Sequence, residues 1–64
     1  MKVKIISLGK IRHSTILEVK ELPDIVKYCK KYLRSREVDY EGDEKAGFIT
    51  AGLRVVGGYE VIEA

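Results

Sequence analysis

A stripe of apolar residues at helical spacing occupies the middle of this chain and restricts its fold to architectures built around one helix. The stripe consists of Leu22, Ile25, Val26, Cys29, Tyr32 and Leu33. Because residues three and four positions apart share one face of an α-helix, the spacing predicts an amphipathic helix with that face buried. Pro23 suits the first helical turn, where its missing N–H costs nothing. Asp24 lies near the positive end of the helix dipole, and Arg34 and Arg36 lie near the negative end.

The same helix is expected to carry a basic face. At about 100° per residue, four cations fall opposite the apolar stripe: Lys27, Lys30, Lys31 and Arg34. Tyr28 lies at the boundary between the two faces. We therefore expect four positive charges to face solvent along one side of the helix.

Two strands are expected before the helix. Residues 3–8 are rich in β-branched side chains and end at Gly9, and residues 15–19 have a similar composition. Residues 9–14 would then form a turn and its shoulders, so that the two strands make a hairpin. No Asn-Gly or Asp-Gly pair fixes the register of this hairpin.

The part of the chain after the helix has two interpretations. Residues 38–41 alternate as in a half-exposed strand, and residues 42–45 resemble a turn. Between Gly47 and Val56 the apolar residues fit both a strand and a helix. A strand is favoured, because Gly47 and Gly52 each cost a helix about 1 kcal/mol relative to alanine and the segment is rich in β-branched residues.

A second hairpin is expected at the adjacent glycines Gly57 and Gly58, between strands at 53–56 and 59–62. If residues 47–56 were helical, Gly57 would end that helix and the last strand would stand alone. The prediction is a single α+β domain over residues 1–64, in which a small, mostly antiparallel sheet carries the amphipathic helix on one face. The order is ββαββ, or ββαβββ if residues 38–41 join the sheet.

The small size of the chain bears on how it is stabilised. A domain of 64 residues hides only about 60% of the surface that its unfolded chain exposes. Cys29 is the only cysteine, which excludes an intramolecular disulfide. His13 is the only other soft or borderline metal ligand, so no bound metal is expected. Close packing and self-association remain as supports, and we expect a homo-oligomer.

The composition also bears on the origin and location of the protein. The chain has no Asn, Gln or Trp, and its charged residues are mostly Lys, Glu and Arg, as is typical of proteins from hot environments. No stretch approaches the roughly 18 apolar residues of a membrane span, and the apolar run after Met1 is too short for a signal peptide. We therefore expect a cytoplasmic protein with a reduced thiol and no membrane partner.

Charge is distributed unevenly along the chain, although the formal net charge is only +2. Residues 1–37 hold ten basic and four acidic side chains, a net charge of +6. Residues 38–64 hold two basic and six acidic side chains, a net charge of −4. Such asymmetry indicates a charged partner.

We interpret the basic half as a candidate contact surface for an anion or a nucleic acid. Its members are the helix cations Lys27, Lys30, Lys31 and Arg34, together with Lys10, Arg12 and His13 from the first turn. A basic helical face beside an exposed tyrosine, here Tyr28, suits phosphate groups. Lysine acts as a point charge, so such contacts would position a partner without reading its sequence. Two alternatives are a solvated face without a partner and contact with an acidic protein surface, including the acidic half of a second copy.

Residues 47–54 match only part of a phosphate-binding P-loop motif. Gly47 and Gly52 have the glycine spacing of a P-loop, but Leu53 and Arg54 stand where Lys and Ser/Thr are required. We interpret these glycines as a strand bend or bulge.

A calcium-binding loop is likewise incomplete. Asp39, Glu41 and Asp43 match its first three ligand positions, but Glu44 stands where the loop needs glycine and Thr50 where it needs a bidentate glutamate. An acidic surface turn is the interpretation that remains.

No catalytic constellation is found. His13 precedes Ser14, and Cys29 offers a thiol, but neither has a third, orienting group at a recognisable spacing. Cys29 lies within the apolar stripe, where a buried thiol is inert. His13 is expected in a solvent-exposed turn. The sequence therefore predicts no catalytic, cofactor-binding or metal-binding residue.

The aromatic residues suggest core packing rather than recognition. Tyr32 and Phe48 are expected in the core. Tyr40 and Tyr59 could stack on the bases of a single-stranded nucleic acid, as in sheet-based binders, but packing in the core or at a sheet edge is favoured.

Three functional hypotheses follow from the sequence. The first is a non-enzymatic, homo-oligomeric interaction module that binds another macromolecule through its basic helix face or an exposed sheet edge. The second is a weakly specific nucleic-acid-binding protein that uses Lys27, Lys30, Lys31 and Arg34. The third is a small enzyme subunit whose site is completed by a neighbouring subunit.

Overall fold

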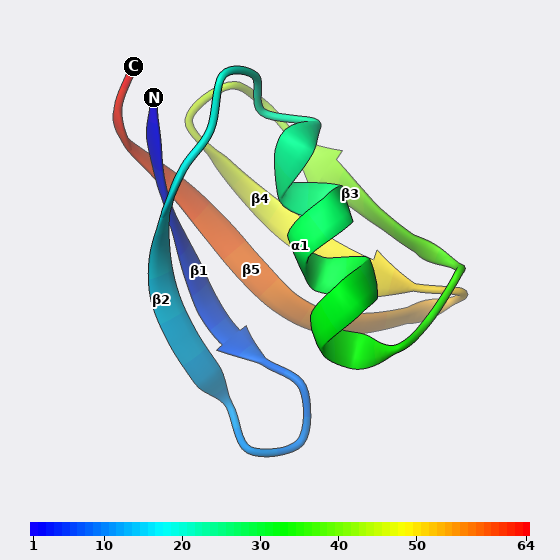
Figure 1. Cartoon of the computed structure of the whole chain (residues 1–64). Coiled ribbons are helices and arrows are strands. Elements are labelled where there is room, and N and C mark those ends of the chain that lie inside the picture. Colours follow the sequence, from blue (N-terminus) through cyan, green and yellow to red (C-terminus); the bar gives the residue numbers. More distant parts are fainter.

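The computed structural model describes all 64 residues and contains one helix and one five-stranded sheet (Figure 1). In chain order the elements are β1 (Lys2–Leu8), β2 (His13–Glu18), α1 (Asp24–Leu33), β3 (Val38–Gly42), β4 (Ala46–Ala51) and β5 (Arg54–Glu63). Neighbouring strands are antiparallel and lie in the order β2-β1-β5-β4-β3. The predicted α+β fold is confirmed, and because β3 pairs with β4 its order is ββαβββ.

The helix packs on one face of the sheet, and the core lies between them (Figure 1). Eight side chains are buried: Val3, Ile5, Leu8, Ile25, Cys29, Val38, Ile49 and Tyr59. Along β1, buried Val3 and Ile5 alternate with exposed Lys2 and Lys4, as expected where a sheet is covered on one side only. The face of the sheet turned away from α1 is called the open face below.

The amphipathic helix is confirmed. Ile25 and Cys29 are fully buried, whereas Lys27 and Lys31 are exposed. Pro23 precedes the first helical residue instead of lying inside the first turn. The helix is ten residues long, and no helix of the structure has the length and apolarity that a membrane crossing takes.

The predicted hairpin at Gly57 and Gly58 is wrong. The turn between β4 and β5 lies at Gly52 and Leu53, where Gly52 has a φ of +64°, and both predicted turn glycines lie inside β5. They serve close packing in the central strand, because a Cβ at Gly57 would lie 3.1 Å from the carbonyl oxygen of Ile6. The strand interpretation of residues 47–56 is correct outside this turn.

Of the predictions for aromatic residues, the one for Phe48 is wrong and the one for Tyr40 and Tyr59 is confirmed. Phe48 is wrongly assigned to the core, because it lies on the open face and is 60% exposed. Tyr59 is buried, its hydroxyl donates to the carbonyl oxygen of Asp43 at 2.7 Å, and its ring meets Tyr40 edge to face at 5.6 Å. Core packing is therefore confirmed for Tyr59 and Tyr40, and neither ring is placed to stack on a base.

Candidate anion-binding groove

The turn between β1 and β2 packs against the C-terminal end of α1. This approach depends on Gly9, whose φ is +76° and where a Cβ would lie 3.3 Å from Cδ2 of Leu33 and 3.6 Å from Cε1 of Tyr32. The Gly9 N–H also donates to the carbonyl oxygen of Val56 at 2.9 Å. The turn is therefore fixed to both the helix and β5.

His13 holds the other side of this turn on the helix. Its ring stacks on Tyr32 with centroids 4.8 Å apart, and its Nε2 lies 3.0 Å from the Tyr28 hydroxyl, within hydrogen-bond distance. His13 is half-buried and is the first residue of β2, so its predicted place in an exposed turn is wrong. His13 is half-buried because the ring of Tyr32 covers one face of its imidazole and the Tyr28 hydroxyl lies at its edge.

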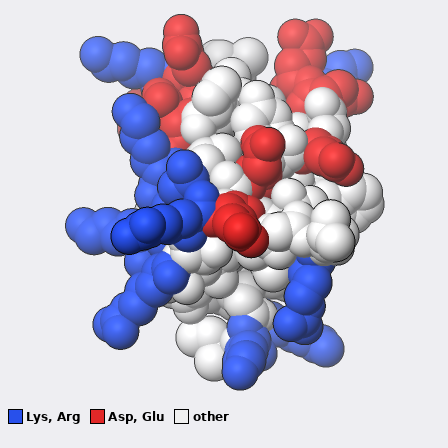
Figure 2. All heavy atoms as spheres, turned by 90° about the vertical axis from the view of Figure 1, so that its right-hand side faces the viewer, with Lys and Arg blue, Asp and Glu red and all other residues white.

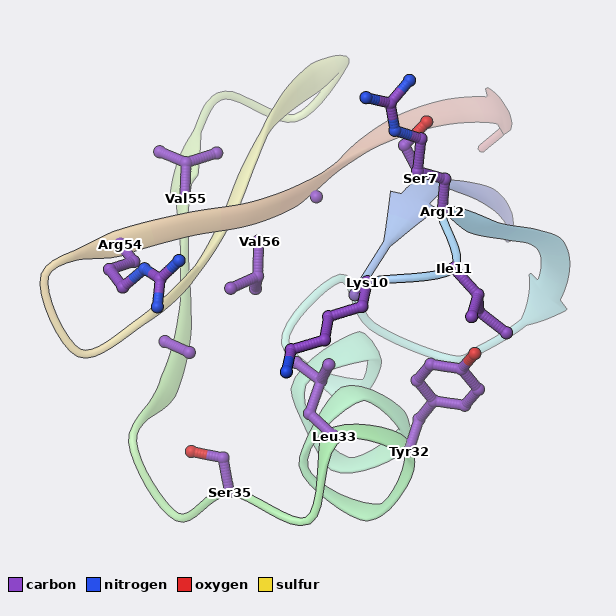
Figure 3. Close-up of a pocket in the computed structure, with 13 residues that line it drawn as sticks. Ser7, Lys10, Ile11, Arg12, Tyr32, Leu33, Ser35, Arg54, Val55 and Val56 are labelled. Carbon is purple, nitrogen blue, oxygen red and sulfur yellow. The ribbon is translucent and has the colours of Figure 1, made fainter.

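A groove of about 790 Å³ opens between this turn, the end of α1 and the start of β5 (Figure 3). It is called the basic groove. Its lining residues are Ser7, Gly9, Lys10, Ile11, Arg12, Tyr32, Leu33, Ser35, Ala51, Arg54, Val55, Val56 and Gly57. The lining thus combines apolar side chains, backbone next to glycines, and cations.

Three cations and no carboxylate line the basic groove. Figure 3 shows Lys10 reaching across the groove toward Leu33 and Arg54 turned inward beside Val56, whereas Arg12 extends away from the rim. Two of the cations are arginines, whose guanidinium groups can donate two parallel hydrogen bonds to a phosphate or carboxylate. The groove is therefore suited to an anion that also presents an apolar surface.

Strained backbone gathers around the basic groove. Only three non-glycine residues have a positive φ: Ser7 (51°), Arg12 (54°) and Arg34 (53°). Ser7 and Arg12 line the groove, and Arg34 lies between Leu33 and Ser35, which also line it. Left-handed backbone at such residues costs about 1–3 kcal/mol each and tends to occur at ligand-binding sites.

The predicted contact residues lie on two different surfaces, the basic groove and the exposed face of α1. Lys10 and Arg12 line the basic groove, whereas Lys27, Lys30 and Lys31 are exposed along α1 and do not. Arg34 is exposed just beyond the helix end. In Figure 2 the charged side chains at the lower end of the molecule are all Lys or Arg, while Asp and Glu lie in the upper and central parts of the view.

Arg54 is the groove residue that the sequence interpretation missed. It belongs to the acidic half of the chain. The misplaced hairpin also assigns Arg54 and the residues that pair with β1 to two different strands, whereas both lie in β5. Gly52 is the residue that indicates the true turn, because glycine readily takes the positive φ that such a turn needs. A turn at Gly52 places Arg54 at the first position of the next strand.

The other titratable groups form no second site. Burial raises the pKa of Cys29 to about 11, so its thiol is neutral and unreactive at neutral pH. Oδ1 of Asp43 accepts hydrogen bonds from the backbone N–H groups of Ala46 and Lys45, which lower the pKa of this carboxyl group. No three His, Cys, Asp or Glu side chains are grouped so that they could hold a metal ion.

Comparison with known proteins adds no assignment, since no family model, curated protein or solved structure matches the chain.

Proposed function

We propose that this protein is a non-enzymatic binding module that holds a single-stranded nucleic acid in the basic groove. Lys10 and Arg54 contact phosphates inside the groove, Arg12 contacts the strand where it leaves the groove past the rim, and the apolar side chains of Leu33 and Val56 contact the bases. The observation that carries the proposal is a concave lining with three cations and no carboxylate.

The mixed lining favours a single strand over a duplex. Single strands expose both a charged backbone and the flat apolar faces of their bases, and their binding proteins combine a positively charged groove with aromatic side chains on which the bases stack. In the basic groove we propose that apolar side chains take the place of those aromatic ones. A duplex presents its phosphates on a convex surface and keeps its bases stacked inside. The concave shape of the basic groove therefore supports the single strand.

Little sequence preference is expected of this module. The chain has no Asn or Gln, the side chains that read adenine edges with two hydrogen bonds. Phosphate contacts position a nucleic acid without reading it. The module is thus proposed as a general binder of single strands.

Binding is tested by the fluorescence anisotropy of a labelled oligothymidylate across a salt series. Three neutralised phosphates predict a slope of about −2 for the logarithm of affinity against the logarithm of salt concentration. Affinity should then fall roughly 20-fold between about 50 and 200 mM salt. Binding that does not respond to salt, or no binding at the lowest salt, contradicts the proposal.

A charge-matched pair of variants locates the site. Lys10→Glu/Arg54→Glu removes two groove cations, and Lys20→Glu/Lys45→Glu makes the same change in net charge at exposed residues outside the groove. The groove variant should lose at least tenfold in affinity, and the control should lose much less. Equal losses would show that binding follows net charge alone. A polyglutamate peptide that displaces the oligonucleotide as well as unlabelled oligonucleotide does would assign the groove to acidic proteins.

A further inference from the structure

The two edges of the sheet are formed by β2 and β3, which have a neighbouring strand on one side only (Figure 1). The free side of an edge strand exposes N–H and C=O groups to which another strand can pair, and proteins usually protect such edges with charged side chains, bulges or covering segments. The two edges of this sheet differ in how far they are protected.

The edge along β3 is closed by carboxylates. The Gly52 N–H donates to the carbonyl oxygen of Glu37 at 2.8 Å, and the alternation that starts from this pair turns the N–H of Tyr40 to the free edge. That N–H donates to Oδ1 of Asp39 at 2.8 Å. Asp39 and Glu41 are both exposed on this strand, so a second β3 laid antiparallel beside it would bring carboxylates together. β3 is therefore a poor partner for another strand.

The edge along β2 has no such cap. The amino group of Met1 donates to the carbonyl oxygen of Val19 at 2.8 Å, and the Val19 N–H donates to the carbonyl oxygen of Met1 at 2.9 Å. Doubly bonded pairs recur at every second residue of an antiparallel ladder, so the N–H and C=O groups of Ser14, Ile16 and Glu18 point to the free edge. No side chain makes a hydrogen bond to these backbone groups.

The side chains of β2 do not protect this edge either. The strand has no Lys, Arg or Pro, and Thr15 and Ile16 at its centre are β-branched, as is typical of residues that pair in sheets. Ile16 is 59% exposed and lies on the open face, opposite Lys4 of β1. The β2 edge therefore combines free backbone groups with an exposed apolar side chain.

We propose that β2 pairs with β2 of a second copy, antiparallel, about a two-fold axis at Ile16. In this register Ile16 faces its own copy and exchanges a pair of backbone hydrogen bonds with it, and Ser14 faces Glu18. The exposed apolar side chain is then covered by an identical one, and the serine hydroxyl meets the glutamate carboxylate. On the side of the helix, Thr15 faces Leu17, so no like charges oppose each other along the strand.

The side chains of β2 favour a second copy over an unrelated peptide. A strand that covers Ile16 needs an apolar residue at its centre and an uncharged hydrogen-bond donor opposite Glu18, and β2 itself supplies both. Arg12 and Lys20 would approach only outside the strand, where the chain turns at Arg12, with a φ of 54°, and bends toward α1 at Lys20. The joined sheet then has β3 at both of its edges. Because these edges are closed, the assembly stops at two copies.

The test is the molar mass of the full chain, measured by light scattering without nucleic acid between micromolar and millimolar concentration. Two paired strands share a small area, so the molar mass of the wild type should rise with concentration from 7.3 kDa toward twice this value. Ile16→Glu should weaken the association at least tenfold, because two carboxylates then meet at the axis. Within its own chain the new carboxylate lies opposite Lys4, which favours the fold.

Phe48→Glu is the matched control. Phe48 is 60% exposed on the open face, as Ile16 is, but it lies in β4, which has a neighbouring strand on each side. This variant should associate as the wild type does, and circular dichroism checks that both variants are folded. A wild type that stays monomeric throughout, or an Ile16→Glu that associates equally well, overturns the proposal. Loss of association in Phe48→Glu alone would place the interface on the open face and also overturn it.

Cysteine substitution tests the register. Facing residues of a bonded antiparallel pair have Cα atoms about 5.5 Å apart, within the range of a disulfide, so Ile16→Cys should form a covalent dimer when oxidised by copper phenanthroline. Glu18→Cys lies on the same face and edge, but about 14 Å from its copy, and should not. Cys29 is buried and should not react. Equal cross-linking of both variants would exclude this register. The result is independent of the basic groove, because neither Ile16 nor Glu18 lines it.

Discussion

The rings of His13 and Tyr32 are stacked at 4.8 Å with an angle of 17° between their planes, and this contact joins the start of β2 to the last turn of α1. Nε2 of His13 and the Tyr28 hydroxyl, 3.0 Å apart, make a second connection between the same elements. Lys10 and Arg12 project from the turn that these contacts hold. The ring of His13 thus holds the turn from which two groove cations project, and His13 itself does not line the basic groove.

Removal of this ring should loosen the turn and destabilise the fold. His13→Ala loses one aromatic stack and one hydrogen bond, so the free energy of unfolding should fall by about 1–2 kcal/mol in urea titrations. His13→Phe keeps the stack and should recover about half of the loss. Lys20→Ala, an exposed control outside both contacts, should change it by less than about 0.5 kcal/mol. If His13→Ala leaves the free energy of unfolding unchanged, the stack does not stabilise the fold.

Gly47 lets β4 pass directly against the ring of Tyr59. A Cβ at Gly47 would overlap the carbonyl oxygen of Glu41 and lie 2.7 Å from both Cε1 and the hydroxyl oxygen of Tyr59. Gly47→Ala should therefore lower the free energy of unfolding by about 2–3 kcal/mol. Gly58→Ala, where the new Cβ would be 3.3 Å from the nearest atom, should cost less than about 1 kcal/mol. Chemical denaturation of both variants measures the difference, and equal costs would contradict the close approach at Gly47.

The sequence predicts the helix well because its face is determined locally. A residue at positions 22–33 is buried or exposed according to the helical period alone, so Cys29 and Lys31 both lie where the wheel puts them. Strands are harder, because the alternation must be counted from a correctly placed turn. The misplaced turn at Gly57 and Gly58 therefore divides β5 between two predicted strands, and Phe48 is wrongly assigned to the core although its neighbour Ile49 already occupies the inward face of β4.

The candidate site could be predicted only in part, for a related reason. Lys10 and Arg12 are close in sequence, and both line the basic groove. Arg54 joins them through the pairing of β1 with β5, a contact between residues about 50 positions apart that no local pattern encodes. The partners of His13 are also remote, since Tyr28 and Tyr32 reach it only after the helix has folded back on the sheet.

The buried thiol of Cys29 should make stability depend on pH at alkaline values. Burial raises the pKa of this thiol from 9.0 to about 11, so the unfolded chain loses its proton at lower pH than the folded chain. The stabilisation is complete below pH 9 and is lost as the pH rises through 11. Between these values wild type should lose about 2 kcal/mol more than Cys29→Ala in urea titrations. If the unfolding free energies of wild type and Cys29→Ala fall in parallel as the pH rises, this prediction is contradicted. A second test uses a thiol reagent, which should label Cys29 of the wild type at neutral pH only after unfolding.

The helix cations and the basic groove should contribute differently to nucleic-acid binding. Lys27→Glu/Lys31→Glu changes exposed residues that do not line the groove, so it should lower affinity only several-fold, with little change in the salt dependence. Lys10→Glu/Arg54→Glu removes two direct contacts and should reduce the slope of the salt dependence by about 1.4. Anisotropy titrations measure both. Loss of binding in the helix variant alone would move the site to the exposed face of α1.

Arg34 ends α1 in a left-handed conformation with a φ of 53°, and its N–H donates to the carbonyl oxygen of Lys30. Glycine takes this conformation without strain, so Arg34→Gly should raise the free energy of unfolding by up to about 1 kcal/mol. Arg36→Gly is the control, because Arg36 has no positive φ and glycine there should give no gain. If the strained backbone around the basic groove serves binding, Arg34→Gly should also bind oligothymidylate more weakly than wild type. A variant that is more stable and binds equally well would show that this strain is unrelated to the groove.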